Sequence, residues 1–232
     1  MPLGAEKSPS GYDGDDGMEQ TEDLDEFLIR NFEGIQLKKP LFYNSPNAIR
    51  FEMGGVVDIP EERAEQVRER AFALFNTLNN PEDCIYFVLF MDVWRNEEIE
   101  TLKDEVGKVF EIYMPELDFK SVLIENVEFR YGDLDDFEEK IETIRFSSKM
   151  QFQQLKLESL VEAIANRTLG LEPIVIGDIY IINTSNKSIF HLYDDRGMDI
   201  VAKNKEILRK VYVQCNSWIL DYDRVRIDAM FL

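Results

Sequence analysis

The stretch of sequence that decides the fold is IFHLYDDRGMDIVA, residues 189–202. Polar and apolar residues alternate on both sides of the central Asp-Asp-Arg-Gly, which is typical of two strands joined by a short connection. Asp at the first and Gly at the fourth position of that connection match a type I turn. Alternation places Ile189, His191 and Tyr193 on one face of the first strand and the residues between them on the other.

The segments on either side extend this pattern. Asp178–Asn183 alternates in the same way, and Thr184–Lys187 separates it from Ser188, so the two runs predict a β-hairpin. After the third strand, Asn204 can cap a helix whose apolar residues recur at helical spacing as far as Ile219. We therefore expect a C-terminal β-meander followed by helices.

The rest of the chain predicts further strands and helices around this meander. The apolar run Cys84–Met91 favours a strand covered on both faces, at the centre of the sheet. The other expected strands are Ala48–Met53, Phe119–Tyr131 with a bulge near Glu125, and Ile144–Leu155. The expected helices lie within 21–34, 60–78, 97–113, 157–169 and 225–231. The predicted fold is α+β, with a mixed, mainly antiparallel sheet and packed helices.

Composition divides the chain into a tail and a folded part. Of the 232 residues, 44% are hydrophobic, so the chain can bury a core. Residues 1–20 are rich in Gly, Ser, Pro and Asp, which predicts a disordered acidic tail, and residues 21–232 are expected to form a single domain. Residues 177–232 carry equal numbers of acidic and basic side chains, whereas the whole chain has a net charge of −20.

Charge and hydropathy exclude several classes of function. A net charge of −20 is unfavourable for binding nucleic acid, since a binder neutralises phosphates with Lys and Arg. The apolar run Cys84–Met91 is too short to cross a bilayer, so no membrane association is expected. Two cysteines without metal-ligand spacing are typical of a reducing, cytoplasmic location. No motif for a cofactor or metal is present.

One family resemblance emerges from these residues. Residues 189–202, followed by WILDYDR at 218–224, resemble the C-terminal signature of a bacterial family catalogued only as a domain of unknown function. The segments IRFE at 49–52, AIAN at 163–166 and IIN at 181–183 are similar too. The resemblance covers the chain from about Leu41 onward, and it implies no activity.

An enzyme is one hypothesis for the signature. His191 would act as acid or base, Asp194, Asp195 or Asp199 as its carboxylate partner or as ligands of a divalent metal, and Arg196 would hold an anion. The structural alternative is that the turn residues form ion pairs with Asp221, Asp223 and Arg224, which would tie the turn to the final helix.

A non-enzymatic interaction module is the leading hypothesis. An acidic body attracts a basic protein partner, as in a toxin-neutralising, immunity-like inhibitor. Candidate binding residues are the acidic block Asp133, Asp135, Asp136, Glu138 and Glu139, and the signature residues Tyr193, Trp218, Asp221, Tyr222, Asp223 and Arg224.

Overall fold

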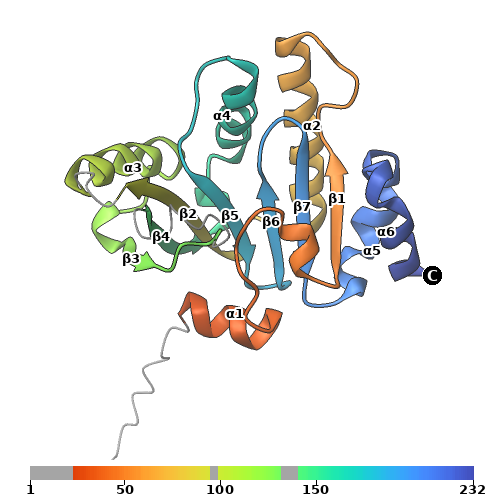
Figure 1. Ribbon diagram of the computed structural model, residues 1–232, viewed down its shortest axis with the longest axis horizontal. Coiled ribbons are helices and arrows are strands. Elements are labelled where there is room, and N and C mark those ends of the chain that lie inside the picture. Colours follow the sequence, from red (N-terminus) through yellow and green to blue (C-terminus); the bar gives the residue numbers. More distant parts are fainter. Residues whose placement is uncertain (1–22, 95–98, 132–140) are drawn as a thin grey trace, which may run out of the picture.

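A computed structural model describes residues 23–94, 99–131 and 141–232 (Figure 1). The predicted acidic tail and the acidic block 133–139 lie outside these residues. Within them, seven antiparallel strands form one sheet in the order β1-β7-β6-β5-β2-β4-β3. The strands are β1 Ala48–Glu52, β2 Cys84–Trp94, β3 Leu123–Val127, β4 Ile141–Gln151, β5 Asp178–Asn183, β6 Ser188–Leu192 and β7 Gly197–Ala202.

The helices have the bounds α1 Leu24–Phe32, α2 Pro60–Leu78, α3 Ile99–Tyr113, α4 Leu157–Leu169, α5 Lys205–Gln214 and α6 Arg224–Phe231. Short 3₁₀ helices are η1 Leu41–Asn44, η2 Phe119–Ser121, η3 Phe152–Gln154, η4 Asn216–Trp218 and η5 Asp221–Asp223. The α+β class, the antiparallel sheet and the C-terminal meander β5-β6-β7 followed by helices are confirmed.

Several expected boundaries were wrong. The expected strand Phe119–Tyr131 is reduced to β3, because Asp118 caps a 3₁₀ turn just before it. The β3–β4 register runs without a slip, so there is no bulge at Glu125. The expectation that Cys84–Met91 forms the centre of the sheet was also wrong by one strand: β5 occupies the middle of the strand order, and β2 lies beside it, between β5 and β4. β5 is buried at all six positions, which fits its central place.

One face of the sheet is apolar and packs against helices. Phe190 of β6 stacks on Phe75 of α2, with ring centroids 4.6 Å apart. On the neighbouring part of the face, Phe87 of β2 meets Phe110 of α3 edge-on at 5.3 Å. Stacked and edge-to-face aromatic pairs of this kind add to the free energy of burial. This face therefore supplies much of the hydrophobic core. α1 adds to the core from the other face, where the ring of Phe27 lies 5.9 Å from that of Tyr86 of β2.

The opposite face carries a row of polar side chains. Cross-strand register places Arg50 of β1 opposite Asp199 of β7, and Asp199 opposite His191 of β6. The His191 ring stacks on Tyr180 of β5 with centroids 4.1 Å apart, which continues the row. Figure 1 shows residues 35–45, which follow α1 and include η1, passing across β6 and β7. We call residues 35–45 the strap.

Candidate functional site

The polar row centres on a buried group of three charges. Arg50 binds Asp199 through two hydrogen bonds, Nε to Oδ1 at 2.7 Å and Nη2 to Oδ2 at 2.8 Å. Its Nη1 lies 3.7 Å from Oδ2 of Asp223. Burial acts to lower the pKa of Arg50, but its hydrogen bond and ion pair with Asp199 outweigh this and raise the pKa. The arginine is therefore a permanent cation between two buried carboxylates.

These three residues come from three separate parts of the family resemblance. Arg50 belongs to the segment at 49–52, Asp199 to the stretch 189–202, and Asp223 to the stretch 218–224. The fold brings them together because β1 pairs with β7 and because residues 219–220 run beside β1. The signature thus has a common structural role, which is to join the first strand to the C-terminal segment.

The strap binds this group of charges through a main-chain N–H and two aromatic side chains. The main-chain N–H of Phe42 donates to Oδ2 of Asp199 at 2.9 Å, and the Tyr43 hydroxyl donates to Oδ1 of Asp223 at 2.8 Å. The Phe42 ring lies 5.2 Å from the guanidinium carbon of Arg50 and 4.6 Å from that of Arg226. Cations beside an aromatic ring are attracted by its quadrupole, so the strap is held by aromatic as well as polar contacts.

A second polar centre forms around Asp178 at the start of β5. Its Oδ1 accepts from Nε2 of His191 at 2.8 Å and lies 3.1 Å from Nζ of Lys39. Its Oδ2 accepts from Nη1 of Arg130 and from the Tyr180 hydroxyl, both at 3.0 Å. Burial acts to raise the pKa of Asp178, but the bond to His191 and the surrounding cations outweigh it, so the pKa lies well below its usual value.

His191 is part of this centre and is sealed from solvent. Its exposed fraction is 0%, and Nδ1 makes no hydrogen bond to any described residue. A general acid or base must come within hydrogen-bonding reach of its substrate. The described geometry instead gives His191 a carboxylate partner that the sequence analysis missed. Asp178 lies two residues before Tyr180 on the same strand face, and this alternation was the available signal.

The Asp-Asp-Arg-Gly connection is satisfied by local and long-range contacts. Oδ1 of Asp194 accepts from the N–H of Arg196 at 2.8 Å, and the two side chains form an ion pair. Asp195 pairs with Arg63 of α2, and its Oδ1 accepts from the Thr168 hydroxyl of α4 at 2.6 Å. The connection is a bend held by the Asp194 side chain, and it is tied to α2 and α4.

The expected ion pairs between this turn and the final helix are therefore wrong. Arg224 pairs with Asp221 at 3.0 Å within its own segment, while Asp223 faces Arg50. The physical reason is position: α2 and α4 lie beside the connection, whereas residues 221–224 lie at the outer edge of β1. The remaining signature residues are peripheral, with Tyr222 86% exposed and Trp218 half-buried against Arg70.

Gly197 gives a first prediction. A Cβ atom at this position would collide with the Tyr193 side chain. Burial raises the pKa of Tyr193, so its hydroxyl stays protonated. We expect Gly197→Ala to lower the free energy of unfolding by about 1–3 kcal/mol, as overpacking does. Chemical denaturation measures this. The control Gly107→Ala, where a helical Cβ makes only ordinary contacts with Phe119, is expected to be neutral or stabilising; equal effects at the two sites would contradict the prediction.

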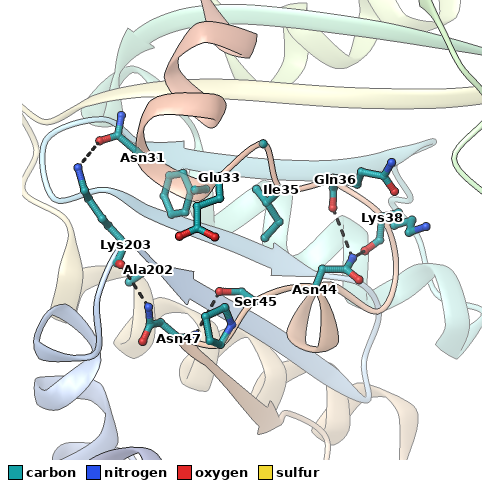
Figure 2. A pocket seen from close by; sticks show the side chains of 13 residues that line it. Asn31, Glu33, Ile35, Gln36, Lys38, Asn44, Ser45, Asn47, Ala202 and Lys203 are labelled. Atoms are coloured by element: carbon teal, nitrogen blue, oxygen red, sulfur yellow. Dashed lines mark hydrogen bonds between the residues drawn. The ribbon is translucent and has the colours of Figure 1, made fainter.

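A cavity of about 380 Å³ lies beside the strap, between the end of α1 and the turn that follows β7 (Figure 2). Nζ of Lys203 binds Oδ1 of Asn31 at 3.0 Å, and the Asn47 amide donates to the Lys203 carbonyl at 3.2 Å. Asn44 donates to the carbonyl of Lys38 at 3.3 Å. None of the acid, base or metal candidates lines this cavity, so it is separate from the polar centres.

The part of the chain that the structure describes contains no group of three or more His, Cys, Asp or Glu side chains placed to hold a metal ion. No helix among the described residues is long and apolar enough to cross a membrane. The five acidic residues Asp133, Asp135, Asp136, Glu138 and Glu139 lie outside the described residues.

Comparisons with known proteins agree with the resemblance seen in the sequence. Residues 24–223 match the model of a domain of unknown function, DUF3885. The "Uncharacterized protein YnaE" of Bacillus subtilis (strain 168) is 24% identical over 213 residues, which is 84% of this chain and 96% of that protein. No solved structure matches. The family match spans most of the chain and includes all three residues of the buried charge group, and the chain therefore belongs to the DUF3885 family.

Proposed function

We propose that this chain is a non-enzymatic interaction module that binds a basic protein, as a toxin-neutralising inhibitor does. The observation that carries the proposal is that buried aspartates of residues 177–232 are paired within the chain. Asp178 binds Arg130 and Lys39, Asp194 binds Arg196, Asp195 binds Arg63, and Asp199 binds Arg50. Carboxylates paired in this way stabilise the fold. They leave little unpaired negative charge that could act in catalysis.

The unbalanced negative charge lies elsewhere, because residues 177–232 are neutral and the net charge of −20 therefore falls within residues 1–176. Exposed acidic side chains on α2 and α3 include Glu61, Glu62, Glu69, Asp104, Glu105 and Glu111. A surface of one sign speeds association with a partner of the opposite sign and repels partners of its own sign. A protein with a net charge of −20 therefore favours a cationic partner.

The alternative is an enzyme or ligand-binding protein that uses His191, Asp194, Asp195 and Arg196, with or without a divalent metal. The geometry supports it less well, because His191 and Asp195 are held by different partners on different elements. Ion-pair networks of this kind imitate the charge clusters of active sites.

Partner capture tests the proposal. The tagged chain, expressed in its native cells, is expected to retain one basic protein in a fixed ratio at low salt and to release it at high salt. Reversal of Asp133, Asp135, Asp136, Glu138 and Glu139 to lysine is expected to weaken the complex about tenfold or more. Affinity is then measured on the purified pair by calorimetry.

Capture alone is not sufficient support. The chain must also suppress the activity or toxicity of the captured protein when the two are co-expressed. The proposal fails if no basic protein is retained in a fixed ratio, or if the retained protein is not inhibited. Retention that is indifferent to salt and to the five reversals would exclude the acidic block as the contact surface.

A further inference from the structure

The two edges of the sheet differ in how they are closed. The outer edge of β1 is covered by the C-terminal segment, since the N–H of Leu220 donates to the carbonyl of Arg50 at 3.0 Å and Phe51 bridges to Ile219. The outer edge of β3 pairs with nothing among the described residues, because β3 is last in the strand order and pairs only with β4. An open edge presents unpaired N–H and C=O groups that can bind another strand.

The side chains around β3 select the charge of such a strand. Glu125 lies on β3, and the exposed Glu128 is the first residue after the end of β3. Arg145 of β4 pairs with both carboxylates beside it, with Nε bonded to Glu125 at 3.0 Å and Nη2 bonded to Asp25 of α1 at 2.8 Å. One cation between two carboxylates leaves this group with one negative charge. Like charges on directly opposed strands are destabilising, so a second copy of this acidic chain is disfavoured. A strand with lysine or arginine is favoured.

Apolar surface is available at the same place. Leu123, the first residue of β3, is 49% exposed. A cavity of about 460 Å³ begins where β3 ends. Its apolar lining includes Val127, Phe129, Phe90 and Leu37, and its charged lining includes Asp25, Glu128, Arg130 and Arg145. In strand addition, main-chain hydrogen bonds give affinity and pockets for alternate side chains give specificity. The edge therefore suits a segment that alternates basic and apolar residues.

We propose that β3 is the docking strand for the basic partner, which adds an extended segment to its outer edge. This inference rests on the proposed function and gives it a location. The contact is defined by the exposed Glu128, by the one negative charge left on the Asp25–Arg145–Glu125 group, by the open edge and by the exposed Leu123. The adjoining cavity receives an apolar side chain of the added segment.

A synthetic peptide tests the docking mode. The probe is a short peptide of alternating lysine and valine, and its control is the same peptide N-methylated at alternate residues, which keeps the charge but cannot complete a ladder. The unmethylated peptide is expected to bind about tenfold tighter at low salt, because only it makes the main-chain bonds. Amide chemical-shift changes at residues 123–127 on titration locate the site. Equal binding of the two peptides would overturn strand addition.

Charge variants separate this inference from the proposed function. The test variant is Asn126→Lys with Glu128→Lys, and the control is Asn76→Lys with Glu62→Lys on α2, which makes the same charge change at exposed positions. We expect the test variant to lose about tenfold in affinity for the peptide and the control less than twofold. Equal losses would overturn β3 as the site while leaving a general attraction for basic partners. If neither the peptide nor any basic protein binds the native chain, the proposed function fails as well.

Discussion

Replacement of Arg50 by methionine is expected to lower the free energy of unfolding by about 3–5 kcal/mol, the usual effect of removing one partner from a buried ion pair. Asp199 has an exposed fraction of 0%, and without Arg50 its carboxylate keeps, among the described residues, only the N–H of Phe42 as a hydrogen-bond donor. Asp223 also loses its cation. Urea unfolding followed by circular dichroism measures the effect.

Two comparisons sharpen this prediction. Arg209→Met removes an exposed pair with Glu206 and is expected to leave the unfolding midpoint unchanged. The double variant Arg50→Met with Asp199→Asn is expected to cost less than the sum of its single variants, because the two residues act on one interaction. Additive losses, or an Arg50 variant as stable as the native chain, would show that the charge group does not hold the fold.

The variant Asp178→Asn is expected to have the second large effect, a loss of about 3 kcal/mol at neutral pH. An amide in this place cannot neutralise Arg130 and Lys39, and it cannot accept four donors as the carboxylate does. The variant leaves Lys39 of the strap and Arg130 without the counter-charge that they share. The Asp221→Asn control, at an exposed position, is expected to change stability little.

A comparison of the native chain with the Asp178→Asn variant predicts how stability depends on pH. Since the pKa of Asp178 in the folded chain is below its ordinary value of 3.8, its stabilising contribution is complete above pH 3.8 and is lost as the pH falls below it. The stability difference between native and Asp178→Asn proteins is therefore expected to be constant near neutral pH and to narrow in acid below about pH 4. A difference that stays constant down to pH 3 would contradict the assignment.

Local patterns in the sequence predicted the local parts of this structure. Asn204 caps α5 through hydrogen bonds to the N–H groups of Glu206 and Ile207, as its place before the apolar periodicity indicated. Alternation correctly separated His191 from Phe190, because successive side chains on a strand point to opposite faces. Turn residues also located the hairpin between β5 and β6.

The partners of the charged residues could not be predicted in the same way. Arg50 and Asp199 are 149 positions apart, and Arg63 and Asp195 are 132 apart. No periodicity links such residues, and only the strand order and the register decide that they meet. One signal was present in part: Asp199 lies between Met198 and Ile200 in an otherwise apolar strand, which indicates a buried charge that needs a partner.

The pairing of β1 with β7 also determines when the protein can finish folding. β1 precedes β7 in the chain, with 149 positions between Arg50 and Asp199, and β7 is its one strand neighbour among the described residues. During synthesis β1 therefore stays without this neighbour until β7 has emerged. The residues that cover its other edge, Ile219 and Leu220, are synthesised later still. Contacts between such distant segments slow folding, because a long loop must close before the contacts are made. A nascent chain truncated before Gly197 would therefore expose β1 without its partner strand. Such a segment is prone to aggregation and is a binding site for chaperones.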